Sequence, residues 1–142
     1  MKDESFFPLL RLVEEGFNGG RIELLDEFIH PNVVEHSSNP LMGTGLEAMK
    51  RRMVAVREAF PDAHLDIEDI TASADKVWWR WRLTATHQRE FLGVPPTGRK
   101  IETTGASIER IADGKIVEHW SFSDRLAMWD QLGVDIPAAA RP

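Results

Sequence analysis

Residues 108–120 read IERIADGKIVEHW, with Asp113-Gly114 between two apolar segments. Asp-Gly favours a two-residue hairpin turn, because both central residues of that turn take a positive φ. The segment therefore predicts two antiparallel strands, roughly residues 100–111 and 115–122, that meet at this turn.

Upstream of the hairpin, residues 63–87 predict two more strands. Apolar Ala63, Leu65 and Ile67 alternate with polar residues, so His64 is expected to face water. Prolines at 95 and 96 predict a loop before the hairpin, because proline cannot donate a hydrogen bond to a sheet. The odd positions from 77 onward form one strongly apolar strand face: Val77, Trp79, Trp81, Leu83, Ala85 and His87.

Helical periodicity surrounds these strands, over about residues 5–17, 22–30, 44–60 and 123–133. Thr44 and Glu47 have capping-box spacing, and Gly133 stands where a C-terminal cap is expected. The charged residues between Lys50 and Glu58 are expected on a solvated helix face. The residues expected to face inward are Phe6, Leu10, Val13, Phe17, Leu25, Ile29, Leu46, Met49, Met53, Val56, Phe60, Leu126, Trp129 and Leu132.

The predicted order is two helices, a short strand at residues 32–37, a helix, four antiparallel strands and a last helix. Without repeated β-α-β units, helices packed on one face of a curved antiparallel sheet are the natural arrangement. A chain of 142 residues has the size of one domain. We therefore expect a single α+β domain over residues 1–142, with a core at about 5–133, a tail at 134–142, and a pocket between sheet and helices.

The composition excludes several classes of function. The 17 Lys and Arg residues are outnumbered by 23 Asp and Glu residues, so a nucleic-acid partner is not expected. The absence of cysteine excludes disulfides, thiolate metal sites and a cysteine nucleophile, and fits a cytoplasmic protein. The absence of tyrosine removes the phenol as an oxyanion donor. The apolar runs are too short for a membrane span, and no histidine spacing indicates a metal site.

Several segments together resemble the SnoaL-like polyketide cyclase family of the nuclear transport factor 2-like superfamily. The resemblance extends from about residue 10 to 133. The segments that carry it are Ala59-Phe-Pro-Asp62, Thr84-Ala-Thr-His87, residues 91–99, residues 108–120, Asp124 and Gln131-Leu-Gly133.

This resemblance implies a cone-shaped curved antiparallel sheet, helices on its concave face, an interior cavity and a homodimer packed through the sheet. Characterised cyclases of this kind close a ring by an intramolecular aldol reaction without a metal or cofactor, using an aspartate near the end of the last strand as acid/base. The matching position is Asp124. Glu109 and Arg110 stand where a partner histidine of the family is expected.

We predict catalytic roles for Asp124, His87 and His36. Asp124 shares strand parity with Trp120 but follows Ser123, so it is either an acid/base at the cavity or a helix cap. His87 ends the apolar strand face, and His36 ends the short strand, where the family often places a pocket histidine. His119 has the opposite parity to Trp120 and is expected on the outer or dimer-facing side. The predicted substrate-binding residues are Trp79, Trp81, Trp120, Phe17, Phe60 and Arg110.

The function predicted from these residues is a cofactor-independent cyclase or isomerase acting on a small carbonyl or aromatic compound. Asp124 would take the proton, and a histidine or a tryptophan N–H would hydrogen-bond the developing enolate. Two alternatives remain open. An epoxide-opening hydrolase needs paired carboxylates bridged by an arginine around a water, and Asp124 with Arg110 supplies only part of that set. A ligand-binding or dimerisation module needs no chemistry at all.

Overall fold

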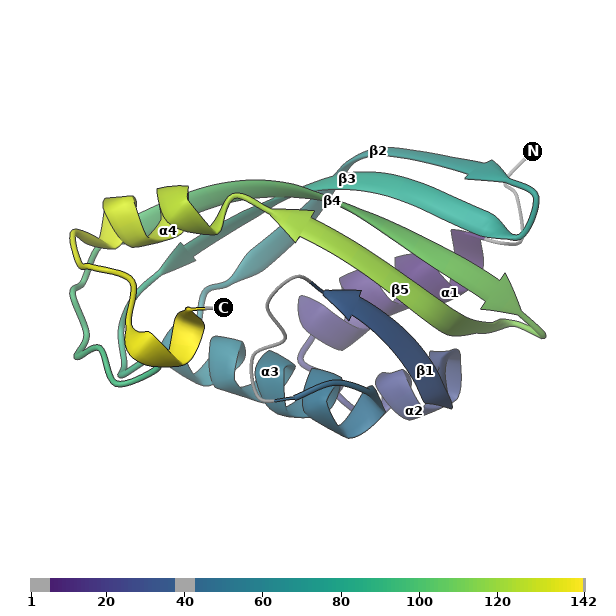
Figure 1. Cartoon of the computed structure of the whole chain (residues 1–142), viewed down its shortest axis with the longest axis horizontal. Helices are drawn as coiled ribbons and strands as arrows, with labels where there is room; N and C mark the ends of the chain where they lie inside the picture. Colours follow the sequence, from purple (N-terminus) through teal and green to yellow (C-terminus); the bar gives the residue numbers. More distant parts are fainter. Residues whose placement is uncertain (1–5, 38–42, 142) are drawn as a thin grey trace.

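The computed structural model describes residues 6–37 and 43–141. Its strands form one curved sheet, and its helices lie mostly beneath that sheet (Figure 1). The elements are α1 (Phe7–Arg11), a π-helical turn (Leu12–Phe17), α2 (Leu24–Phe28), β1 (Ile29–Ser37), α3 (Leu46–Ala59), β2 (His64–Ser73), β3 (Lys76–Thr86), β4 (Lys100–Ala112), β5 (Lys115–Ser123), α4 (Arg125–Leu132) and a 3-10 turn (Ala138–Ala140).

The sheet has the strand order β1-β5-β4-β3-β2. Strands β2 to β5 are antiparallel neighbours, and the predicted hairpin between β4 and β5 is confirmed. Asp113 and Gly114 have φ values of 52° and 74°, the conformation that their turn requires. The short first strand adds to the edge of the sheet as the parallel partner of β5. The predicted α+β fold class is therefore confirmed.

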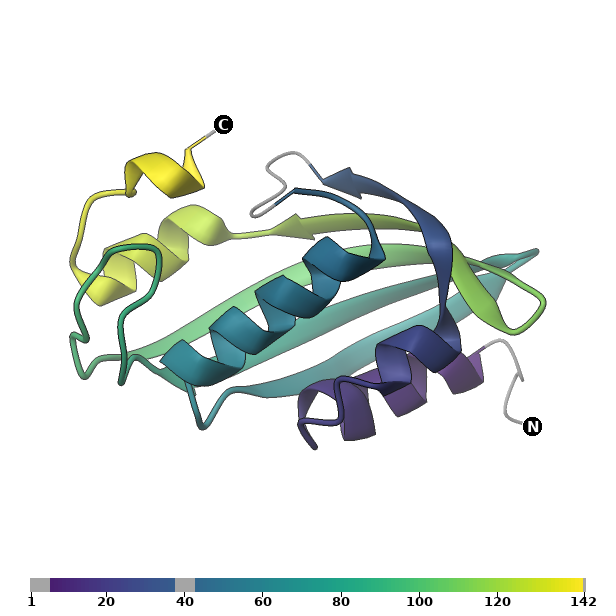
Figure 2. The same cartoon turned by 90° about the horizontal axis from the view of Figure 1, so that it is seen from below.

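The concave face of the sheet is covered by α1, the π-helical turn, α2 and α3 (Figure 2). The π-helical turn contains more residues per turn than an α-helix, so the inward side differs from the predicted one. Leu9, Leu12 and Val13 are buried, whereas Phe6 and Leu10 are only partly buried. The part of the chain described here contains no helix with the length and apolar character needed to cross a bilayer.

Two predictions for the helices are wrong. The first turn of α3 has Gly45 at its N-cap and no side-chain cap, so the Thr44–Glu47 capping box does not form. Leu126 is 60% exposed, because α4 buries only the side that carries Trp129 and Leu132. The C-terminal tail also contributes to the core, where Ala140 packs in the cluster that contains Trp129.

A β-bulge in the hairpin decides which side chains of β5 face the helices. Directly after the turn Ile111 pairs with Ile116, but Arg110 pairs with Glu118 and not with Val117. The extra residue reverses the alternation of β5 beyond this point. His119 consequently faces the concave side, whereas Trp120 faces outward.

Candidate functional site

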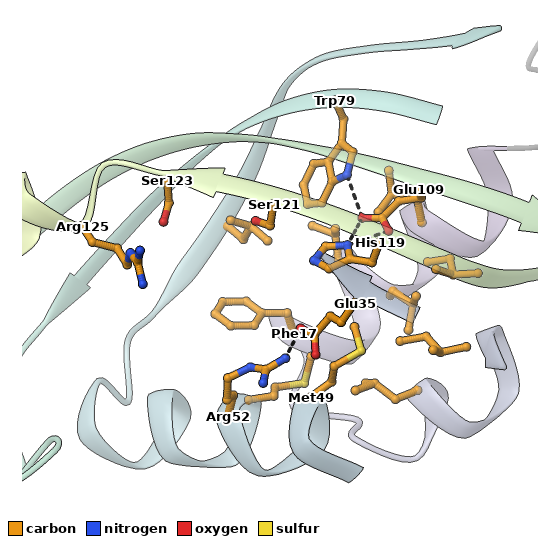
Figure 3. Close-up of a pocket in the computed structure, with 18 residues that line it drawn as sticks. Phe17, Glu35, Met49, Arg52, Trp79, Glu109, His119, Ser121, Ser123 and Arg125 are labelled. Carbon is orange, nitrogen blue, oxygen red and sulfur yellow. Dashed lines mark hydrogen bonds and ion pairs between the residues drawn. The ribbon is translucent and has the colours of Figure 1, made fainter. Parts of the chain in front are cut away.

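A cavity of about 350 Å³ lies between the concave face of the sheet and the helices, within the range of small-molecule sites. Its walls are mainly apolar side chains from the helices, including Leu12, Val13, Phe17 and Met53. The polar groups come from β1, β4, β5, α3 and α4 (Figure 3). They are Glu35, Glu109, His119, Ser121, Ser123, Arg52 and Arg125.

Glu109 and His119 form a buried pair across β4 and β5. Residues directly opposite each other in a ladder lie on the same face, which brings these two side chains together. His119 Nδ1 lies 2.7 Å from Glu109 Oε2, and Trp79 Nε1 donates to Glu109 Oε1 at 3.2 Å. The Glu109 side chain is only 3% exposed. In Figure 3 the other nitrogen of the imidazole, Nε2, points away from Glu109 and toward the interior of the cavity.

The pKa of His119 is raised above its ordinary value of 6.5. Burial by itself lowers this pKa, because it penalises the charged imidazolium, but the adjacent Glu109 carboxylate and the hydrogen bond to it outweigh burial. The more distant Glu35 acts in the same direction. The Glu109 carboxylate also fixes Nδ1 as the protonated nitrogen of neutral His119, so that Nε2 carries the lone pair.

Glu35 places a second carboxylate on the other side of His119. It lies on β1 opposite His119, and its side chain is 4% exposed. Arg52 from α3 forms an ion pair with it, and the backbone N–H of Gly45 donates to its Oε1 at 3.2 Å. Arg52 is therefore part of the cavity wall and not of the solvated helix face predicted for residues 50–58.

Two serines and a tryptophan continue the polar wall along the strands. Trp81 Nε1 donates to Ser107 Oγ at 3.1 Å, and Ser107 Oγ donates to Ser121 Oγ at 3.1 Å. Ser121 lines the cavity, whereas Ser107 is buried behind it. The site thus combines a carboxylate–histidine pair with a chain of hydroxyl groups, next to apolar walls.

The sequence profile of the SnoaL-like polyketide cyclase family matches residues 8–132. The chain belongs to this family. An aklanonic acid methyl ester cyclase from Streptomyces peucetius is 34% identical to it over an alignment of 137 residues that covers 91% of this chain and 91% of the relative. A nogalonic acid methyl ester cyclase from Streptomyces nogalater is 30% identical over 82% of this chain and 89% of the relative.

Solved structures of similar sequence share the fold. A putative polyketide cyclase from Streptomyces antibioticus superposes with a TM-score of 0.81 at 35% identity, covering 93% of this chain and all of that one. A putative hydroxylase from Streptomyces galilaeus superposes with a TM-score of 0.82 at 32% identity, covering 92% and 96% of the two chains. Proteins similar to this chain are thus named for different reactions.

Of the predicted substrate-binding residues in this SnoaL-like chain, Phe17 and Trp79 line the cavity. Trp81 is linked to it through Ser107 and Ser121. The remaining predicted residues lie elsewhere. Phe60 stacks on the His87 ring in a separate core cluster, with ring centroids 5.2 Å apart.

The prediction that Trp120 faces the cavity and His119 faces outward is wrong. Trp120 stacks on His36 on the outer side of the sheet, with ring centroids 4.8 Å apart. His36 Nε2 lies 2.6 Å from Glu118 Oε2, and Arg110 Nε donates to the same carboxylate at 2.8 Å. His36, Trp120 and Arg110 are therefore on the opposite face of the sheet from the cavity.

His87 and Asp124 are also placed away from the cavity. His87 is fully buried, and its Nδ1 accepts the backbone N–H of Thr97 at 3.2 Å. Burial lowers the pKa of His87 below its ordinary value. Asp124 is exposed and caps α4 by accepting the backbone N–H of Ala127 at 3.1 Å. The catalytic roles of Asp124, His87 and His36 stay predictions that only substitution can test.

The sequence predicts the hairpin that carries Glu109 and His119, but not their pairing. A regular ladder from the Asp113-Gly114 turn would pair Glu109 with Glu118, and nothing in the residues marks the bulge that pairs it with His119. No sequence pattern indicates that Glu35 and Arg52 line the cavity, because their contact depends on where β1 and α3 lie relative to β5.

Proposed function

We propose that the chain is a cofactor-independent cyclase or isomerase whose general base is His119, positioned by Glu109. One observation carries this proposal: His119 Nδ1 lies 2.7 Å from a buried carboxylate while Nε2 points into a largely apolar cavity. A carboxylate that orients an imidazole and stabilises its protonated form is the arrangement that makes histidine an effective base. The cyclases among its relatives support the same reaction class.

The proposed reaction is an intramolecular aldol closure. His119 Nε2 takes a proton from a carbon next to a carbonyl, and the resulting enolate carbon attacks a second carbonyl of the same molecule. A carbon–carbon bond forms, and the second carbonyl oxygen becomes an alkoxide. The imidazolium of His119, stabilised by Glu109, returns its proton to that alkoxide, so the site ends in the state in which it began.

The proposed substrate is a small, largely apolar polyketide ester with an acidic C–H. Apolar side chains such as Phe17 and Met53 supply broad walls, and polar groups are concentrated on the sheet side. The relatives named above act on aklanonic and nogalonic acid methyl esters, and these two compounds are the first substrates to assay.

The test compares H119Q with D124N. Asn is as good an N-cap as Asp, so D124N removes the acid/base group and keeps the cap of α4. We expect H119Q to lose activity on the methyl esters by about two to four orders of magnitude, the usual contribution of general acid–base catalysis, and D124N to retain most of it. Full activity in H119Q would contradict the role of His119 as the base. Loss of activity in D124N would support Asp124 as the acid/base.

A second candidate is hydrolytic epoxide opening. The residues that support it differ from the predicted Asp124 and Arg110: Glu35 and its ion-pair partner Arg52 line the same cavity as Glu109 and His119. Incubating a styrene oxide probe with the protein in ¹⁸O-labelled water distinguishes this candidate. Labelled diol that disappears in both E35Q and E109Q would favour the hydrolase, and a lack of diol alongside turnover of a methyl ester would exclude it for that probe.

The homodimer implied by the family is also part of the proposal. The outer face of the sheet exposes Trp78 and Phe122, which are 45% and 58% exposed, and the edge strand exposes Val34. A second copy of the chain packed through this face would bury them. Light scattering after size-exclusion chromatography should give a dimer mass for the wild type and a monomer mass for W78E/F122E.

A cytoplasmic location stays a prediction of the composition.

A further inference from the structure

A chain of hydrogen bonds ends at the cavity. It starts at the indole N–H of Trp81, passes through the hydroxyl of Ser107 and reaches the hydroxyl of Ser121, with both donor–acceptor distances at 3.1 Å. Ser107 is 2% exposed, so its hydroxyl is satisfied within the protein. Ser121 is the member of the chain that lines the cavity.

The direction of the first bond follows from the chemistry of the indole. An indole nitrogen can only donate, so Ser107 Oγ must accept from Trp81. The hydrogen of Ser107 is then donated to Ser121 Oγ. Because Ser121 accepts this bond, its own hydrogen is left to donate into the cavity. Each bond polarises the next, so Ser121 becomes a better donor than an isolated serine.

The position of Ser121 suits a developing negative charge. Ser121 and His119 lie two residues apart on the same face of β5, so their Cα atoms are roughly 6–7 Å apart. A ligand can place an acidic carbon about 3 Å from His119 Nε2 and the neighbouring carbonyl oxygen about 2.7 Å from Ser121 Oγ. The base and the donor then act on adjacent atoms of one enolate.

We propose that Ser121 is the oxyanion donor of this site, and that Ser107 and Trp81 are positioning residues that orient and polarise it. The proposal rests on the proposed function for its substrate, an enolate. It assigns the role of oxyanion donor to a serine in a chain that has no tyrosine to supply a phenol for that role.

Gly105 shows that the strands are built to admit the Trp81 ring. Gly105 pairs with Trp81 across β3 and β4, and a Cβ at this position would overlap the indole and lie 2.6 Å from the carbonyl oxygen of Phe122. Only glycine leaves the space in which the indole lies across β4 toward Ser107.

The test measures the binding of an oxyanion without turnover. 4-Nitrophenol is the probe, because its phenolate resembles an enolate and is visible by absorbance, and nitrobenzene is the neutral probe of similar shape. We expect the wild type to favour the phenolate, and S121A to weaken phenolate binding about tenfold or more, the cost of losing a hydrogen bond to a charged group. Nitrobenzene binding should change much less. S107A and W81F should weaken phenolate binding in the same direction but by less.

S123A is the matched control, because it removes a hydroxyl from the same face of the same strand but outside the chain of hydrogen bonds. It should weaken phenolate binding less than S121A does. The proposal is overturned if S121A binds the phenolate as tightly as the wild type, or if S107A and W81F both leave phenolate binding unchanged. Failure of the wild type to convert either methyl ester would count against the proposed function alone, since phenolate binding does not depend on it.

Discussion

Replacing Glu109 by glutamine removes the buried negative charge beside His119 and keeps the shape of the side chain. In the wild type the carboxylate accepts from both His119 and Trp79, at 2.7 and 3.2 Å. In E109Q the single amide oxygen is the acceptor for both His119 and Trp79. No carboxylate charge then remains at this position to offset the lowering of the His119 pKa by burial. The pKa of His119 should therefore fall below its wild-type value.

The expected loss of stability depends on pH, and its sign follows from the raised pKa of His119. The stabilisation from the charged pair is fully present below pH 6.5, the ordinary pKa of histidine, and is lost as the pH rises through the folded-state pKa. A hydrogen bond to a charged group contributes about 1.5–3 kcal/mol. E109Q should therefore lower the unfolding free energy by about that amount at pH 6, and by less as the pH rises through the folded-state pKa of His119.

Urea unfolding followed by tryptophan fluorescence at several pH values measures this difference, and NMR titration of the imidazole signals gives the pKa of His119 directly. E118Q is the matched control, because it removes a carboxylate from another His–Glu pair, the more exposed pair with His36 on the outer face. It should leave the titration of His119 unchanged. An unchanged His119 pKa in E109Q, or a loss of stability that stays the same below and above the wild-type His119 pKa measured by NMR, would refute the reasoning.

Three further predictions follow from the packing. G105A should destabilise the protein by about 1–3 kcal/mol and shift its tryptophan emission, because the new methyl group displaces the Trp81 ring; unchanged emission would contradict this. D124A should cost about 1 kcal/mol in urea unfolding through the lost cap of α4, and D124N much less; equal losses would argue against a capping role. His87 binds a proton near pH 6.5 in the unfolded chain but only at lower pH in the folded chain, so stability should fall as the pH drops from 6.5 toward the folded-state pKa of His87. H87N should flatten this dependence of stability on pH.

Much of the fold could be predicted from the local chemistry of the sequence. The positive φ of an Asp-Gly turn fixes the β4–β5 hairpin wherever the rest of the chain lies. The period-two alternation of residues 77–87 likewise determines that Trp79 and Trp81 share a face, because side chains alternate in any strand. The segments that resemble the SnoaL-like family also identified it correctly.

The candidate site depended on contacts that no local pattern encodes. One bulged residue in β5 exchanges the faces of His119 and Trp120, and its presence is decided by how β4 and β5 pack as a ladder. Glu35 meets His119 only because β1 pairs in parallel with β5, and Arg52 joins them only because α3 crosses the concave face. The sequence by itself determined the elements and the family, through short-range backbone and periodicity effects. Only the tertiary structure decided which ionisable groups share a cavity, because strand register and helix placement are set by the packing of the whole chain.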